Sequence, residues 1–187
     1  MTTITLGLLL WSLVHFLPSV GAPVKTRILQ TNFGKKAYQG IFSLLLILAI
    51  VLMVMGWKQT IPTHLYTLPA FTQPLALLLM LSGFICLVAA NLPAKIKSVI
   101  RHPQLTGVLL WASAHLMLNG DNRSLLLFGG LGLWAILEIV FINRREGAWV
   151  KPDNTSWSKT ALAIVIGCVL FSVLAFFHPY LAGVQIV

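Results

Sequence analysis

Long apolar runs constrain this chain more than any other feature of its sequence. Crossing the roughly 30 Å hydrocarbon core of a bilayer takes about 20 helical residues, and only a helix satisfies its backbone polar groups within one segment there. The chain has 187 residues, is 58% hydrophobic and is only 9% charged, whereas soluble domains are about 25% charged. Six runs are long enough to consider, at about residues 3–20, 39–57, 72–91, 103–119, 124–142 and 160–178. The sequence therefore predicts an all-α, polytopic transmembrane helix bundle of about six spans, formed by one domain over residues 1–187.

Basic residues are concentrated in alternate loops between these spans. The second loop holds only Lys58, and the fourth holds Arg123 beside Asp121. The first, third and fifth loops carry the remaining clusters, which are Lys25, Arg27, Lys35 and Lys36, then Lys95, Lys97 and Arg101, then Arg144, Arg145, Lys151 and Lys159. The positive-inside rule places these odd-numbered loops in the cytoplasm and both termini outside. The same rule accounts for the net charge of +9, so we expect a lipid bilayer as the partner and no nucleic acid.

A short pattern occurs in both the first and the fourth span. Gly-x3-Trp-x3-His covers residues 7–15 and, without a gap, residues 107–115. These spans are equivalent in a 3+3 layout and cross in opposite directions, which is typical of an inverted repeat around a site near the midplane. Coincidence is the alternative interpretation, because the other spans show no comparable match.

The two histidines of this pattern, His15 and His115, are the first candidates for a functional role. Residues four apart stack on one helix face, so Trp11 and Trp111 each lie one turn from a histidine, and Asn119 extends the second stripe. A histidine in the hydrocarbon region is costly unless it faces the interior. With a rise of about 1.5 Å per residue, the two imidazoles lie roughly 10 Å apart in depth. A macrocycle between them fits this separation, whereas one small ion would need larger helix tilts.

Glu138 is the acid that lies well inside a predicted span. An acid within a membrane is a functional candidate because burying it is costly. The other interpretation is structural: a carboxylate that reaches toward Arg144 or Arg145, or a carboxyl group that stays neutral. The sequence leaves both interpretations open.

Residues 101–129 carry the pattern R-H-P-Q-L-x-G-x-x-L-W-x-x-A-H-L-x-x-N-G-D-x-x-S-L-L-L-F-G. This segment resembles the NnrU family, and it is more distantly similar to plant zeta-carotene isomerase through R-H-P-Q-x-x-G and A-H. Further segments that resemble the family extend the likeness over nearly the whole chain; these are residues 13–19, 38–40, 87–93 and 178–184.

The resemblance implies functional expectations that the spacing alone does not provide. NnrU proteins are associated with denitrification and nitric oxide metabolism, which implies a multi-pass protein of the bacterial inner membrane. The isomerase binds haem b through histidines that match His15 and His115, and it isomerises a carotenoid double bond. Haem b between the first and fourth spans is thus the expected cofactor, and an apolar polyene is one candidate substrate. The isomerase has a switching cysteine where this chain has Ala112, so that mechanism is not expected here.

The leading hypothesis is therefore a haem b protein with His15 and His115 as axial ligands. Trp11 and Trp111 would line the macrocycle, with Asn119 one turn beyond His115. We expect such a protein to act in nitrogen-oxide metabolism or to catalyse a haem-dependent, isomerase-like reaction.

Arg101 and His102, at the cytoplasmic start of the fourth span, would hold a haem propionate. Their R-H-P start also resembles membrane isoprenylcysteine methyltransferases, so a methyltransferase-like enzyme with a cofactor at this site is an alternative. A non-enzymatic factor for the assembly or regulation of nitrogen-oxide enzymes is another. A metal transporter that uses His15 and His115 is disfavoured, because Glu138 is the single acid in the predicted spans.

Overall fold

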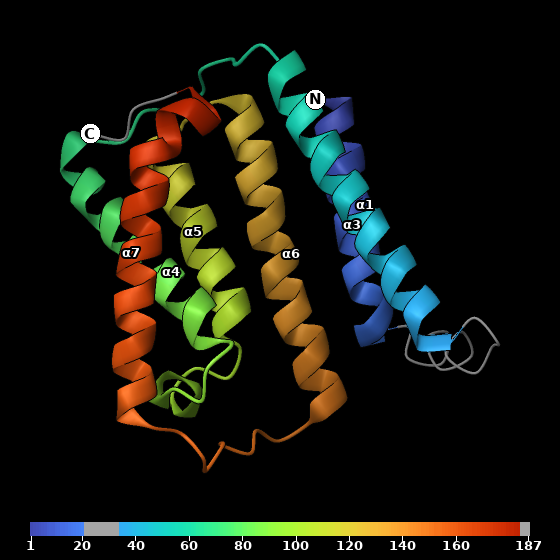
Figure 1. Ribbon diagram of the computed structural model, residues 1–187. Helices are drawn as coiled ribbons and strands as arrows, with labels where there is room; N and C mark the ends of the chain where they lie inside the picture. Colours follow the sequence, from blue (N-terminus) through green and yellow to red (C-terminus); the bar gives the residue numbers. More distant parts are fainter. Residues whose placement is uncertain (21–33, 184–187) are drawn as a thin grey trace. The chain divides into compact units, whose positions relative to one another are not determined.

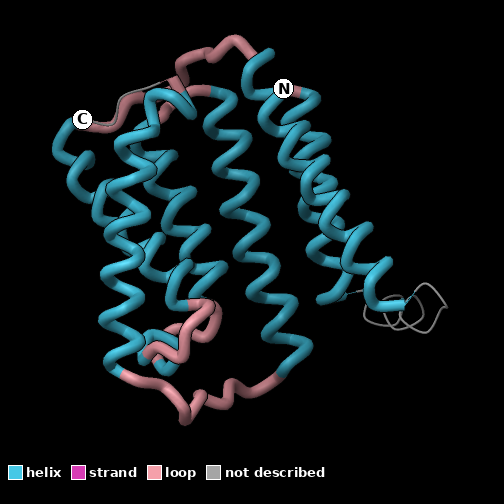
Figure 2. The backbone as a smooth tube through the Cα atoms, viewed as in Figure 1, coloured by secondary structure: helices cyan, strands magenta, loops and turns pink. Residues whose placement is uncertain are grey.

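The computed structural model describes residues 1–20 and 34–183, and the described part of the chain contains helices and no strand. Figures 1 and 2 show these helices. In chain order, the elements are α1 (Thr2–Val20), α3 (Gly34–Gln59), η1 (Ala70–Thr72), α4 (Gln73–Ala89), η2 (Lys95–Ser98), α5 (Pro103–Leu118), α6 (Asn122–Glu146) and α7 (Trp157–Ala182). The predicted all-α class is confirmed.

Five of the described helical segments are long and apolar enough to cross a membrane, so the chain is a multi-pass integral membrane protein. These segments are Thr2–Val20, Lys35–Gln59, Ala70–Ala89, Asn122–Glu146 and Trp157–Tyr180. The fourth predicted span is α5, whose 16 residues extend for about 24 Å. It is the shortest of the six helices that correspond to predicted spans.

Two helices contain a proline near their C-terminal ends. Pro18 lies inside α1, which ends at Val20 as predicted, and Pro179 lies inside α7, beyond the predicted end at 178. Helix α7 ends instead at Gly183, whose φ of 73° is left-handed and whose N–H donates to the Pro179 carbonyl at 2.9 Å. Glycine adopts this conformation without the steric cost that a Cβ atom brings. The proline is thus accommodated within the last turn, and the glycine terminates the helix.

Helix α3 runs without a break from Gly34 and therefore begins before the predicted span at residue 39. Lys35 and Lys36 lie in its first turn, where long side chains can extend toward the membrane surface. Two basic residues of the first loop, Lys25 and Arg27, lie outside the described residues.

The helices form two compact units, which are described separately. The first unit comprises Met1–Leu68 and Asn119–Ala148, and thus contains α1, α3 and α6. The second comprises Pro69–Leu118 and the chain from Trp149 onward, and thus contains α4, α5 and α7. Each unit draws helices from both halves of the sequence, so the units do not coincide with the halves of the predicted 3+3 repeat. The repeat and the single-domain assignment stay predictions.

In the first unit, α1 packs against both α3 and α6. Gly7 permits the contact with α3, because a Cβ atom at this position would lie 2.7 Å from Met53 Cγ and 2.8 Å from the Ala49 carbonyl oxygen. Ile4, Leu8 and Met53 form the buried cluster of this contact. A small residue at the interface lets two membrane helices approach closely.

In the second unit, α4 packs against both α5 and α7. Gly83 and Gly107 face each other, and a Cβ atom at Gly107 would lie 2.8 Å from the Gly83 carbonyl oxygen. Gly107 therefore allows α5 to approach α4 closely, just as Gly7 allows α1 to approach α3. The shared glycine of the two nine-residue patterns serves a close helix contact in both units.

Hydrogen bonds between loops show which helix ends lie together within each unit. In the first unit, the Met1 amino group donates to Thr60 Oγ1 at 2.8 Å, and the Leu65 N–H donates to the Gly120 carbonyl at 2.7 Å. The N-terminus and the second and fourth loops thus share one end. In the second unit, the Ser156 N–H donates to the Pro93 carbonyl at 2.9 Å, which joins the third and fifth loops. Both groupings agree with alternation across a membrane.

Candidate functional site

His15 lies on α1 in the first unit, with a hydrogen bond that defines its tautomer. Its Nδ1 atom lies 2.9 Å from the Trp11 carbonyl oxygen. A carbonyl oxygen only accepts, so Nδ1 carries the hydrogen and donates, and the neutral ring keeps its lone pair on Nε2. The helix itself positions this bond, because residue 11 is one turn before residue 15.

Aromatic rings from all three helices of the first unit surround His15. Its ring centroid lies 4.4 Å from that of Trp11 on α1, 4.8 Å from that of Trp134 on α6 and 5.8 Å from that of Phe42 on α3. The buried indole N–H groups of Trp11 and Trp134 have no hydrogen-bond acceptor within the described chain. Such donors are costly to leave unsatisfied, so they are suited to a ligand that carries acceptor atoms.

His115 lies on α5 in the second unit and has the same local geometry. Its Nδ1 atom donates to the Trp111 carbonyl oxygen at 2.9 Å, and the two ring centroids lie 4.5 Å apart. The Nε2 atom of the neutral ring is therefore again the one with the lone pair. Both Trp-x3-His stripes that the sequence predicts are present, each within its own unit.

The two histidines differ in the titratable group that lies near them. Glu138 on α6 interacts electrostatically with His15, whereas His178 on α7 interacts electrostatically with His115. The first unit thus combines an imidazole with a carboxyl group, and the second combines two imidazoles.

Glu138 is 6% exposed and accepts a hydrogen bond at Oε1 from the hydroxyl group of Ser19 on α1. Its other oxygen, Oε2, is buried and has no hydrogen-bond partner within residues 1–20 and 34–183. Arg145, one of the partners that the sequence suggested, donates instead to the Pro18 carbonyl at 2.9 Å and to Glu146 at 2.9 Å.

The remaining predicted site residues lie at the two ends of α5. Arg101 and His102 precede the helix, and the His102 carbonyl accepts the Thr106 N–H at 2.9 Å, which begins α5. Asn119 was expected to extend the stripe of His115, but α5 ends at Leu118. Asn119 belongs to the first unit, where its carbonyl lies 3.5 Å from the Tyr66 hydroxyl group. The helical stripe therefore ends at His115, because the Asn-Gly-Asp turn has already begun.

Three residues near the histidines were not identified from the sequence as site residues. Trp134 and Phe42 form two walls around His15, and Ser19 is the partner of Glu138. The spacing of Trp134 and Glu138, which are four residues apart like Trp11 and His15, was a signal that could have identified the α6 face. No comparable pattern marks Phe42 in the apolar run of α3.

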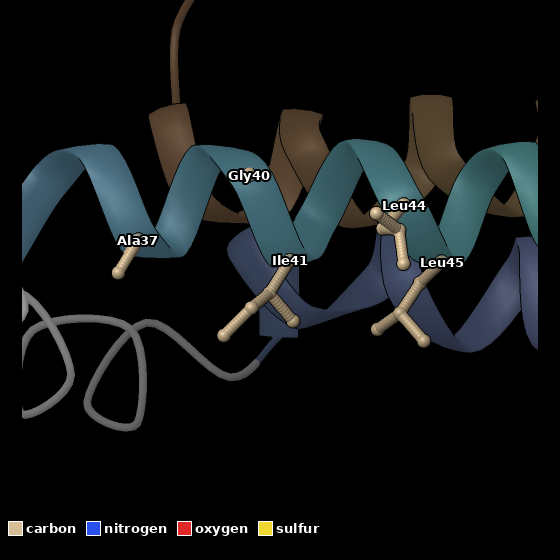
Figure 3. Close-up of a pocket in the computed structure, with 5 residues that line it drawn as sticks. All are labelled: Ala37, Gly40, Ile41, Leu44 and Leu45. Carbon is tan, nitrogen blue, oxygen red and sulfur yellow. The ribbon is translucent and has the colours of Figure 1, made fainter.

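An apolar hollow lies along α3 in the first unit (Figure 3). Its lining residues belong to a single helix and carry no polar side chain; they are Ala37, Gly40, Ile41, Leu44 and Leu45. None of the predicted site residues takes part in it. An exposed apolar helix face of this kind is suited to contact with lipid acyl chains.

The described residues contain no cluster of three or more His, Cys, Asp or Glu side chains that could hold a metal ion. His15 lies instead among the rings of Trp11, Trp134 and Phe42, and His115 lies beside the ring of Trp111. An arrangement of this kind can supply an axial ligand to a planar macrocycle, for which one histidine on a face suffices.

Comparison with known proteins identifies one family. A family model described as NnrU protein matches residues 3–186, nearly the whole chain. Comparisons with curated proteins and with solved structures give no match.

Proposed function

The chain belongs to the NnrU family of membrane proteins, and from this premise we propose that it binds haem b through His15 and His115. The observation that carries the proposal is the hydrogen bond from each Nδ1 atom to a backbone carbonyl at 2.9 Å. Histidine ligands commonly donate their other ring N–H in this way, which orients the ring and increases its basicity. Both imidazoles are thereby prepared to ligate through Nε2.

The surroundings of the two histidines fit a planar aromatic ligand. Trp11 and Trp134 offer flat walls beside His15, and Trp111 offers one beside His115. The unsatisfied indole N–H groups of Trp11 and Trp134 are donors that haem propionate oxygens could occupy. This fit is argued within each unit, and the proposal does not depend on how the units are placed.

The chemistry that haem b supplies when bound is redox change or ligand exchange at iron, tuned by its axial ligands. The Trp11 and Trp111 carbonyl groups hold the imidazoles in one tautomer, and aromatic rings lie beside both imidazoles. Arg101 and His102, at the start of α5, are proposed to contribute positive charge and hydrogen-bond donors toward a propionate. We propose a setting in nitrogen-oxide metabolism, or in an isomerase-like reaction on an apolar polyene, from the family resemblance.

An absorption spectrum of the purified protein in mild detergent tests this function most directly. After expression with ample haem supply, we expect a Soret band and a pyridine haemochrome spectrum of b type. His15→Ala and His115→Ala should each abolish or shift the band. His64→Ala is the matched control, because His64 is an exposed loop residue that contacts Thr67 and should leave the spectrum unchanged.

Two outcomes would overturn the haem proposal. A wild-type protein without a Soret band would favour a non-enzymatic membrane factor. A deletion strain that is defective in denitrification, together with a purified protein that has no measurable turnover, would favour the same alternative. Equal spectra for His64→Ala and His115→Ala would show that the ligand assignment is wrong. The haem content per chain separates one macrocycle with two ligands from two macrocycles with one ligand each.

We also propose that the protein lies in the bacterial inner membrane with both termini outside. The basic loops support this orientation, and the loops that hydrogen bonds join within each unit are those predicted to share a side. Single cysteines at Thr63 and Asp153, in a background without Cys86 and Cys168, can be labelled in intact cells with an impermeant maleimide. Labelling at residue 63 alone is expected, and labelling at residue 153 alone would reverse the orientation.

A further inference from the structure

We propose that Glu138 and Ser19 form a proton-binding site inside the membrane, with the proton carried on Glu138 Oε2. The site lies between α1 and α6 within the first unit. It does not depend on haem binding, because it is formed entirely by side chains of the chain.

The first argument is the cost of a buried charge. Glu138 is only 6% exposed and lies eight residues before the end of α6, about 12 Å along the helix from Glu146. An ionised carboxylate in such surroundings is very unfavourable unless a cation pairs with it, and a group without a cation is held in its neutral form instead. The position thus favours the protonated acid.

The second argument is that no described cation pairs with Glu138, and that two basic residues of α6, Arg145 and Arg123, bind other groups. Arg145 bonds to the Pro18 carbonyl and to Glu146, at the end of α6. Arg123, near the other end of α6, stacks over Trp57 at 4.1 Å and pairs with Asp121 at 3.7 Å. No described residue forms an ion pair with Glu138.

The third argument is the asymmetry of the two carboxyl oxygens. Oε1 accepts from Ser19, which is itself 8% exposed, as the carbonyl oxygen of a neutral carboxyl group can do. The buried Oε2 has no described donor to stabilise a negative charge. A proton therefore resides on Oε2, where it neutralises the acid.

Few titratable groups of the described residues lie on the two helices that form this site. On α1, the helix that packs against α6, His15 lies one turn from Ser19 and is the only titratable side chain. No hydrogen bond joins His15 to Glu138, since the Nδ1 atom of His15 bonds to Trp11. On α6 itself, Arg123, Arg144, Arg145 and Glu146 lie toward the two helix ends.

The chain is well suited to infrared spectroscopy, because Glu138 and Glu146 are its only glutamates. In Glu146→Gln, side-chain ¹³C-labelled glutamate reports on Glu138 alone. The substitution is mild, because the Glu146 side chain is 48% exposed. At neutral pH, without added haem, we expect an isotope-shifted band of a protonated carboxyl group. A spectrum with only carboxylate bands from Glu138 would overturn the proposal.

Two matched variants complete the experiment. Glu138→Gln leaves Glu146 as the single labelled acid, and this residue should show carboxylate bands at the same pH. Ser19→Ala, made in the Glu146→Gln protein, should move the Glu138 carbonyl band to higher frequency, and Ser19→Thr should leave it near its original position. An unchanged band in Ser19→Ala would remove Ser19 from the site. Because the protein is measured without added haem, this outcome is separate from that of the Soret experiment.

Discussion

His15 and His115 donate through Nδ1 to the tryptophan carbonyl one turn earlier, at 2.9 Å in both units, yet their surroundings differ. In the first unit, α1 is the middle helix, and rings from α3 and α6 pack around His15. In the second unit, the middle helix is α4, and His115 lies on α5 at one side of it. The same nine-residue pattern therefore produces the same hydrogen bond but not the same environment. A local pattern can define a tautomer, whereas neighbouring helices define the electrostatic setting.

The acid near His15 and the imidazole near His115 extend this contrast. Glu138 can hold a proton beside the first histidine, and His178 places a second imidazole near the other. The two imidazoles thus share the same local hydrogen bond but have different titratable neighbours within their own units. Comparing matched changes in the two units is thus the most informative approach.

The largest effect is expected at Trp134, a ring from α6 that encloses His15 in the first unit. Trp134 is 5% exposed and packs against Trp11 and His15, so Trp134→Ala should reduce the free energy of unfolding by about 3–5 kcal/mol. An SDS titration followed by circular dichroism measures this loss. Trp157→Ala is the control, because Trp157 is 75% exposed and its loss should cost about 0.5 kcal/mol or less. Similar losses in the two variants would contradict the proposed enclosure of His15.

The shared glycines are expected to have the next largest effect. A methyl group at Gly7 or Gly107 would lie within 2.8 Å of a backbone carbonyl oxygen on the facing helix. Gly7→Ala and Gly107→Ala should therefore each destabilise the protein by about 1–3 kcal/mol.

Gly40→Ala is the matched control for these two changes. Gly40 is also helical but has nothing within 4 Å of the added methyl group. The same SDS titration should show no loss for this variant, or a gain of up to about 1 kcal/mol from helix propensity. Destabilisation of only one of Gly7→Ala and Gly107→Ala would show that the shared glycine has different roles in the two units.

Helix capping also differs between the two units, and we expect its effect on stability to be smaller. Asp121 caps α6 by accepting from the Arg123 and Ser124 N–H groups at 3.0 and 2.9 Å, whereas Ser156 caps α7 through one contact of 3.5 Å. Asp121→Ala should cost about 1–2 kcal/mol, and Ser156→Ala about 0.5 kcal/mol. Differential thermal unfolding in detergent ranks the two losses, and the reverse order would be inconsistent with these cap geometries.

The smallest effect concerns Tyr66, in the loop between α3 and η1. Partial burial raises the pKa of the Tyr66 hydroxyl group above its usual value, and the nearby Asp121 carboxylate raises this pKa further by a smaller amount. A folded-state pKa that is raised contributes stability below the unfolded pKa, near pH 10, and this stability is lost as the pH rises through the folded pKa.

Absorbance titration of tyrosinate measures this shift. Asp121→Asn removes one negative charge and should lower the pKa of Tyr66. Tyr66→Phe identifies which of the three tyrosine transitions belongs to this residue. If the Tyr66 transition keeps its midpoint in Asp121→Asn, the electrostatic contribution of Asp121 is negligible.

Much of the fold could be predicted from hydropathy and turn residues. The predicted run at residues 124–142 lies within α6, and the Asn-Gly-Asp turn separates α5 from α6 as expected. Helix ends were less accurate: α3 begins at Gly34, earlier than the predicted 39, and α7 continues past Pro179. Hydropathy reports the apolar part of a helix, whereas its ends depend on caps and charged side chains that hydropathy does not register.

Part of the candidate site was also accessible from the sequence. The four-residue spacing of tryptophan and histidine determines that the imidazole can reach the backbone carbonyl one turn earlier, because helix geometry alone sets that distance. The tertiary structure decided what surrounds each imidazole. Ser19 and Glu138 are 119 positions apart in the chain, and only the packing of α1 against α6 brings them together. Local hydrogen bonds follow from helix periodicity, whereas the partner of a buried polar group depends on which helices pack together, which no local pattern specifies.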